Sequence, residues 1–150
     1  MRKVGRIITL ATITAAIGAL GGGADATPGS GVSATLLAEG TATKPIHIHS
    51  RGATDVVVRQ ITIQPGGTTG WHYHDGRLMG IVMSGALTHF KRDCSSEVQP
   101  AGHSFMELDG RKQVHMGANR GTVPVVLMVT YFIPKGMPLS QDAPAPSCAK

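Results

Sequence analysis

The stretch GWHYHDGRLMGIVMSG, from Gly70 to Gly85, carries the pattern that decides the fold. Successive side chains of a β-strand point to opposite faces of the sheet, and each residue adds a rise of about 3.3 Å. His72 and His74 therefore share one face, about 6.6 Å apart along the backbone, and their imidazoles can converge on one ion. Trp71 and Tyr73 then point the other way, where packing against a neighbouring strand explains them.

Short β-rich runs continue on both sides of this stretch, and turns rich in Gly, Pro, Asn and Asp separate them. This spacing predicts an all-β sandwich or barrel, and 150 residues suit one domain. The run 123–133 is nearly all apolar and β-branched, which predicts a strand buried on both faces. The other predicted strands are LLAEGT (36–41), PIHIHS (45–50), DVVVRQITI (55–63), TGWHYH (69–74), LMGIVM (78–83), ALTHF (86–90), SFMEL (104–108) and QVHM (113–116).

The N-terminus has the pattern of an export signal. Arg2, Lys3 and Arg6 precede the apolar run IITLATITAAIGAL, and small residues ending at Ala26 follow it. The run is shorter than the roughly 20 apolar residues that span a bilayer. We therefore predict a signal peptide at 1–26, cleaved after Ala26, with an uncleaved anchor as the alternative. Residues 27–35 are predicted to be a flexible lead-in. The mature protein is expected to be secreted, without stable membrane insertion.

Charge and cysteine content narrow the function further. Cleavage removes three basic residues and Asp25, which lowers the formal net charge from +5 to +3. The remaining basic residues are scattered, so we predict no nucleic-acid partner. Cys94 and Cys148 would enter an oxidising compartment, where we expect a disulfide that ties the C-terminal tail 139–150 to the body. Two free thiols are the alternative. Nucleophilic triads, phosphate-binding glycine loops and zinc-finger cysteine patterns do not occur.

Further along the chain, His115 is followed four positions later by Asn119, after a Pro-x-Gly turn at Pro100 to Gly102. The sequence over roughly 36–138 resembles the cupin superfamily, and in particular small bacterial single-domain cupins, many of them exported. The residues that carry this resemblance are Gly66, His72, His74, Gly85, Pro100, Gly102, His115 and Asn119. It implies a single-domain double-stranded β-helix, also called a jelly-roll barrel, with a metal inside. It also implies a homodimer paired through an edge strand, for which PIHIHS could serve.

The chain departs from the cupin pattern at one position. The first motif places a glutamate at residue 78 or 79, where this sequence has Leu78 and Met79. Three alternatives follow. His72, His74 and His115 could bind a metal alone, Glu107 could supply the carboxylate, or the site has decayed to a metal-free pocket. We favour one divalent transition metal (Fe, Zn, Mn, Cu or Ni), because unliganded inward-facing histidines would be costly. Glu107 is either a ligand or a partner that orients a histidine ring.

The other histidines give weaker signals. His47 and His49 repeat the His-x-His spacing, but no surrounding motif supports them, and we expect an N-terminal edge strand with a wet face. His103 is expected to be exposed after the Pro-Ala-Gly turn. The sequence does not determine whether His89 faces the cavity. Asp75 follows His74 directly and is expected to face away from the ion and to shape the turn.

The expected pocket walls are apolar, which favours a small, largely apolar ligand over one that needs a basic clamp. Arg77 and Arg120, the nearest basic residues, are expected in turns. Two functions remain open. One is a metal-dependent, dioxygenase-like enzyme, and the other is a barrel that binds a metal or small ligand without turnover. The expected wall residues are Leu78, Met83, Phe105, Met106 and Val129.

Overall fold

The computed structural model describes residues 30–149. The predicted signal peptide at 1–26 lies outside these residues, as does most of the predicted lead-in. The chain divides into two units, 1–34 and 35–150, and the strands all belong to the second. Among the described residues, no helix has the length and apolar character needed to cross a bilayer.

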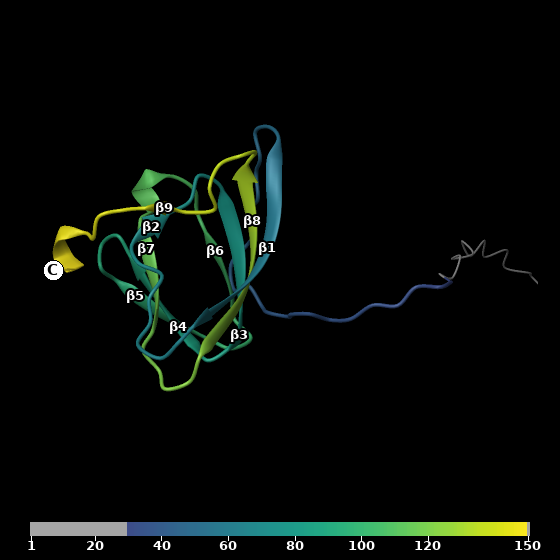
Figure 1. Cartoon of the computed structure of the whole chain (residues 1–150), viewed down its shortest axis with the longest axis horizontal. Helices are drawn as coiled ribbons and strands as arrows, with labels where there is room; N and C mark the ends of the chain where they lie inside the picture. Colours follow the sequence, from purple (N-terminus) through teal and green to yellow (C-terminus); the bar gives the residue numbers. More distant parts are fainter. Residues whose placement is uncertain (1–29, 150) are drawn as a thin grey trace, which may run out of the picture. The chain divides into compact units, whose positions relative to one another are not determined.

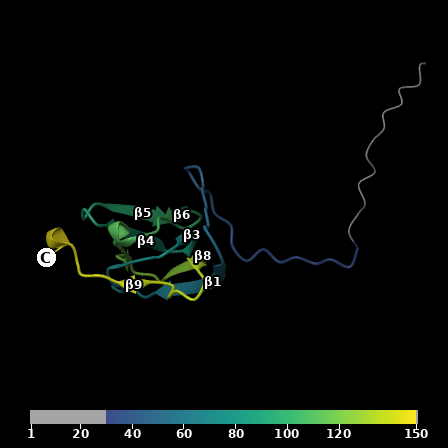
Figure 2. The ribbon, with the colours of Figure 1, turned by 90° about the horizontal axis from the view of Figure 1, so that it is seen from above.

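The second unit consists of two antiparallel sheets, which confirms the all-β prediction (Figure 1). A four-stranded sheet has the order β1-β8-β3-β6, and a five-stranded sheet has the order β5-β4-β7-β2-β9. Seen from above, β5 and β6 lie along one side of this unit, and β1 and β9 lie along the other (Figure 2). The strands are β1 Thr54–Ile63, β2 His72–Tyr73, β3 Arg77–Ser84, β4 Ala86–Lys91, β5 Ser96–Pro100, β6 Ser104–Glu107, β7 His115–Asn119, β8 Val125–Pro134 and β9 Gln141–Asp142, with 3-10 turns η1 Arg111–Gln113 and η2 Ser147–Ala149.

Strand β8 shows how the core is built. From Val125 to Ile133 its residues alternate strictly between a buried inner face and a half-buried outer face, and Pro134 at its end is exposed. The expectation that this strand is buried on both faces is therefore wrong for its outer side, because only one face of its sheet packs on the core. The inner residues of β8 form a buried cluster with apolar side chains from β1, β3, β4 and β6. The buried cluster comprises Ile63, Leu78, Val82, Leu87, Phe105, Val125, Leu127, Val129, Tyr131 and Ile133.

Close packing at one strand pair fixes the orientation of an aromatic ring. Gly80 on β3 is the cross-strand partner of Phe105 on β6. A Cβ atom at Gly80 would lie 2.2 Å from Cζ of Phe105, so only glycine leaves room for the ring. The ring of Phe105 therefore packs against the backbone of β3 at Gly80 and forms part of the buried core.

The two N-terminal strands expected at 36–41 and 45–50 are wrong. Residues 35–53 contain one isolated bridge, between Thr41 and His103, and no strand. Ile46 and Ile48 are exposed, and no neighbouring strand pairs with the backbone around them. Alternating apolar residues form a strand only where a partner completes the ladder. The edge strand on which the predicted homodimer relied is consequently absent from the described residues.

Candidate metal centre

Three separate parts of the chain converge at the polar end of the barrel. His72 on β2 is the direct cross-strand partner of His115 on β7, and His74 is the residue directly after β2. Glu107 is the last residue of β6 in the opposite sheet. One ligand atom from each of these four side chains lies within 4.8 Å of the other three. The structure thus brings together the four residues named from the sequence.

The three histidines share one hydrogen-bonding arrangement. In each ring, Nδ1 donates to a backbone carbonyl oxygen, which can only accept, so Nδ1 must carry the proton. In the neutral ring Nε2 then keeps its lone pair, which is the state that binds a metal. These contacts are His72 Nδ1 to Gly70 O at 2.9 Å, His74 Nδ1 to Leu139 O at 2.6 Å, and His115 Nδ1 to Gln113 O at 2.7 Å.

Glu107 faces these lone pairs from the other sheet. Its Oε2 atom lies 3.0 Å from Nε2 of His74 and 3.0 Å from Nε2 of His115. Both Nε2 atoms are buried and lack a hydrogen-bond partner with acceptable geometry. Buried polar atoms without partners are rare in folded proteins because each one costs desolvation energy. A cation between the four side chains would satisfy all of them, so the residues present fit a metal.

The protonation states follow from burial and from the closeness of the charges. Burial raises the pKa of Glu107, but contacts with His115 and His74 outweigh it and hold the pKa well below its usual range. Burial lowers the pKa of His115, but the Glu107 carboxylate more than offsets this and raises it. Burial dominates at His72 and lowers its pKa. The carboxylate is therefore ionised and His72 is neutral near neutral pH, as metal ligation requires.

His89 belongs to the same site, although the sequence left its direction open. It lies on β4, it is buried, and its Nε2 atom is 3.4 Å from Oε1 of Glu107. Its ring centroid lies 5.1 Å from that of His115. Nε2 of His89 has no hydrogen-bond partner, and burial lowers its pKa. In the sequence, His89 shares one strand face with both the apolar Leu87 and the charged Lys91, so periodicity alone does not determine whether that face points inward.

The remaining predicted histidines lie elsewhere. His47 and His49 are exposed and belong to no metal-binding cluster among residues 30–149. His103 is half-buried, so its expected exposure is wrong, because residues near Thr41 pack along it. The carboxylate of Asp75 accepts a hydrogen bond from Gln141 at 2.8 Å and takes no part in the four-residue cluster.

Asn119, the asparagine of the second motif, has a structural role. Its Nδ2 atom donates to the carbonyl oxygens of Ile63 and Val123, each at 2.8 Å. Its Oδ1 atom accepts from the backbone N–H of Gly121 at 2.9 Å. This buried side chain thus joins the end of β1 to the turn after β7, and fixes the strand that carries His115.

A pocket of about 830 Å³ leads to the cluster and is lined by His89, Glu107 and His115. A second cavity of about 40 Å³ is lined by His72, His74 and Glu107 and by apolar residues that include Leu78, Phe105 and Val129. Phe105 also lines the larger pocket, together with Met106. Met83 lines neither cavity and is 37% exposed, so its predicted role as a wall residue is wrong.

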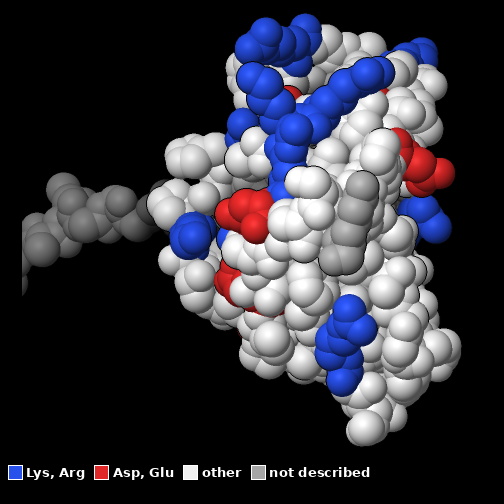
Figure 3. Space-filling view, turned by 90° about the vertical axis from the view of Figure 1, so that its left-hand side faces the viewer, with Lys and Arg blue, Asp and Glu red and all other residues white. Residues whose placement is uncertain are grey.

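The larger pocket is more highly charged than the sequence suggested. On the face shown in Figure 3, Lys and Arg side chains gather over the upper part, with a few acidic side chains among them. The expected basic candidates are not those that line the pocket, because Arg77 pairs with Asp109 and Arg120 stacks over the ring of Phe90. The charged residues that do line it, besides Glu107, are Lys44, Lys91, Arg92, Asp93, Glu97 and Lys112.

The sequence matches no protein-family model and no curated protein. Among solved structures, the chain is similar to a protein from Klebsiella pneumoniae with a double-stranded β-helix domain (23% identity, 62% of this chain and 75% of that chain, TM-score 0.51). It is also similar to the polyketide cyclase RemF from Streptomyces resistomycificus (16% identity, 64% and 66%, TM-score 0.52).

An oxalate oxidase solved with the substrate analogue glycolate matches at 26% identity and a TM-score of 0.46. The match covers 51% of this chain and 41% of the oxidase, so the chain spans less than half of that enzyme. The comparisons confirm the predicted fold class, a double-stranded β-helix.

Proposed function

We propose that this chain, which has the double-stranded β-helix fold of the cupin superfamily, is a metal-dependent enzyme acting on a small molecule. The observation that carries the proposal is the arrangement of its buried donors. Three histidines have Nδ1 committed to backbone carbonyls, and two of their Nε2 atoms meet Glu107 at 3.0 Å without a hydrogen-bond partner. This arrangement supports the second of the three alternatives, in which Glu107 supplies the carboxylate that the cupin motif would place at residue 78 or 79.

Residues His72, His74, His115 and Glu107 would hold the ion. One divalent transition metal (Fe, Zn, Mn, Cu or Ni) would supply a Lewis acid or redox centre there. Three imidazole nitrogens and one carboxylate suit any of these ions. We include in the proposal the dioxygenase-like reaction that the sequence resemblance implies.

The residues around the cluster determine what a bound molecule meets. His89 lies on the pocket side of Glu107, where a neutral imidazole can accept or donate a proton to a molecule beside the cluster. Phe105 lines both cavities and presents an apolar ring near Glu107. The ligand is therefore proposed to be small, with an apolar part against Phe105. Because lysines and an arginine line the wider pocket, a polar or anionic group is proposed to face them.

Export belongs to the proposal as well. The signal-peptide pattern at 1–26 supports it, and the Cys94–Cys148 disulfide is compatible with an oxidising compartment.

Metal analysis of protein purified without a histidine tag tests the proposal. We expect about one ion per chain in the wild type, and loss of that ion in both His72→Ala and His115→Ala. The matched control is His49→Ala, which removes an exposed histidine of the other His-x-His pair and should retain the metal. A wild type that contains no metal and gains no thermal stability from any of the five ions would overturn the proposal. A stoichiometric metal without turnover would instead support a non-catalytic binding barrel.

A further inference from the structure

We propose that the C-terminal residues 139–148, here called the strap, are a positioning element for the metal ligands, and that the Cys94–Cys148 disulfide holds the strap in place. Metal affinity would then depend on whether this disulfide is formed. The inference rests on the proposed function, because it assigns a role to the segment that supports the same four-residue site.

The strap completes the support of a very short strand. Strand β2 has two residues, and it pairs with β7 at a single position, His72 with His115. A two-residue strand has little stability of its own. On the β7 side, the preceding segment adds a bridge between Thr68 and Ala118 and a hydrogen bond from the Thr69 N–H to the Gly117 carbonyl. On its other edge, β9 of the strap pairs with it, with His72 opposite Asp142 and Tyr73 opposite Gln141.

Two further hydrogen bonds extend this contact on either side of the ladder. The backbone N–H of Ala143 donates to the carbonyl of Trp71 at 2.9 Å. The Gln141 side chain donates to the Asp75 carboxylate at 2.8 Å. The strap therefore contacts the ligand-bearing segment from Trp71 to Asp75 along its whole length.

One strap atom acts directly on a proposed ligand. The carbonyl oxygen of Leu139 accepts the Nδ1–H of His74 at 2.6 Å, across 65 residues of sequence. The equivalent acceptors for His72 and His115 lie only two residues from their own histidines. His74 is therefore the one ligand whose ring orientation and tautomer depend on a distant segment. Outer partners of this kind typically change metal affinity by about 10- to 100-fold.

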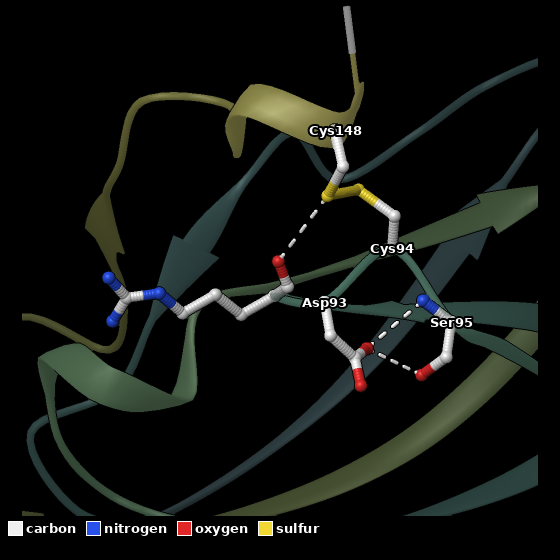
Figure 4. Close-up of a disulfide and its surroundings, with 5 residues drawn as sticks. Asp93, Cys94, Ser95 and Cys148 are labelled. Carbon is white, nitrogen blue, oxygen red and sulfur yellow. Dashed lines mark hydrogen bonds between the residues drawn. A yellow bond between two sulfur atoms is a disulfide. The ribbon is translucent and has the colours of Figure 1, made fainter.

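The disulfide anchors the far end of the strap. Cys148 lies in η2, and its partner Cys94 lies in the turn between β4 and β5 (Figure 4). Asp93 accepts hydrogen bonds from the backbone N–H and the hydroxyl of Ser95, which fixes this turn around Cys94. The cross-link closes a loop of 54 residues in sequence. Without the disulfide, the contacts described above, which Leu139, β9 and Ala143 make with the segment from Trp71 to Asp75, would hold the strap.

Reduction of the disulfide is chemically simple. A water-soluble phosphine reductant gives two electrons to the S–S bond and becomes a phosphine oxide with oxygen from water. Each sulfur takes up one proton and becomes a thiol. Because free thiols themselves bind metals, the affinity is best compared in a protein that lacks both of them.

The test therefore uses the full chain with Cys94→Ser and Cys148→Ser together, and Zn²⁺ in competition with a chelator as the probe. We expect about a tenfold weaker affinity than in the wild type. Gln141→Ala, which removes one strap contact and leaves the disulfide, should lower the affinity by a smaller factor. The control is Ile63→Val, a core change at the end of β1, where Ile63 pairs with Val125. It should lower the melting temperature but removes none of the hydrogen bonds between the strap and the segment from Trp71 to Asp75, so its zinc affinity should equal that of the wild type.

A folded double serine variant with wild-type zinc affinity would overturn the inference. So would an equal loss of affinity in the Ile63→Val control, because the effect would then reflect general stability. A second readout needs no metal. Hydrogen exchange of the Ala143 amide should be faster in the double serine variant, and unchanged exchange counts against the strap even if the wild type binds no ion. Failure of the strap is thereby distinguishable from failure of the proposed metal site.

Discussion

Moving the buried carboxylate from β6 to β3 tests whether the site depends on a position in space or on a position in the sequence. Leu78, where the cupin motif would place glutamate, is the direct cross-strand partner of Glu107, and both face inward. Directly opposed residues have Cβ atoms about 5 Å apart. A glutamate at Leu78 can thus present its carboxylate near the point that Glu107 now occupies. The informative set is Glu107→Leu, Leu78→Glu and the two together.

The three variants should differ in both affinity and stability. Glu107→Leu removes a ligand, which costs at least the 10- to 100-fold seen for outer partners, or about 1.4 to 2.7 kcal/mol. Leu78→Glu alone places a second carboxylate about 5 Å from the first, and at an effective dielectric constant of about 20 their repulsion is about 3 kcal/mol in the metal-free protein. The double variant has one carboxylate again, so it should lose this repulsion and regain most of the metal affinity.

Metal stoichiometry, chelator competition and urea unfolding measure these effects. The matched control pairs Glu107→Leu with Met79→Glu, because Met79 occupies the alternative motif position but lies on the half-buried outer face of β3. That pair should not regain affinity. If Glu107→Leu keeps wild-type affinity, the site consists of three histidines and the argument is refuted. If Glu107→Leu with Leu78→Glu recovers no more metal affinity than Glu107→Leu with Met79→Glu, the idea that residues 78 and 107 can place a carboxylate at the same point is refuted.

Three other perturbations follow from the structure. Gly80→Ala should lower the free energy of unfolding by about 1 to 3 kcal/mol in urea titrations, because the new Cβ would overlap the Phe105 ring; an unchanged midpoint would contradict this packing. Replacing Cys94 and Cys148 with serine should cost about 4 kcal/mol, from the chain entropy of a 54-residue loop, and a calorimetric change below about 1 kcal/mol would show that entropy of this loop does not stabilise the fold. Burial lowers the pKa of His89 in the folded protein, so the unfolded chain binds a proton at this histidine at a higher pH than the folded chain does. The free energy of unfolding that the neutral His89 contributes is therefore complete above the unfolded pKa near 6.5, and it is lost as the pH falls through the lower folded pKa. Metal-free His89→Gln should therefore lose less stability than the wild type between pH 6.5 and 5, and parallel curves would contradict this sign.

The sequence predicted the parts of the site that follow from local periodicity. The two-residue repeat of a strand places His72 and His74 on one face regardless of what surrounds them. The nearly continuous apolar, β-branched run at 123–133 likewise predicted a core strand, although its outer face is half-buried. The disulfide between Cys94 and Cys148 was predicted because export would place the two cysteines in an oxidising compartment, and the bond is present in the structure.

Other features depend on partners that are distant in the sequence and could not be found from periodicity. The run 45–50 alternates like a strand but finds no ladder, whereas the polar SEVQP forms β5 because β4 pairs with it. His89 alternates in a regular strand, but its inward direction follows from the pairing of β4 with β7. The Leu139 carbonyl carries no signal at all, because every residue has the same backbone oxygen.

Under the proposed function, the convergence of Glu107 with the histidines explains how the carboxylate expected at residue 78 or 79 can be supplied from β6. In an antiparallel pair, two residues far apart in sequence share nearly one position on the inner face, as Leu78 and Glu107 do on β3 and β6. A carboxylate can therefore move to the neighbouring strand without moving far in space, while the histidines keep their rotamers through backbone hydrogen bonds. The same geometry favours an apolar residue opposite Glu107, since a second carboxylate there would face the first in a buried cavity. The residues at 78 and 107 are then energetically coupled. A double-mutant cycle over the two positions should show a coupling energy of about 3 kcal/mol in the metal-free protein.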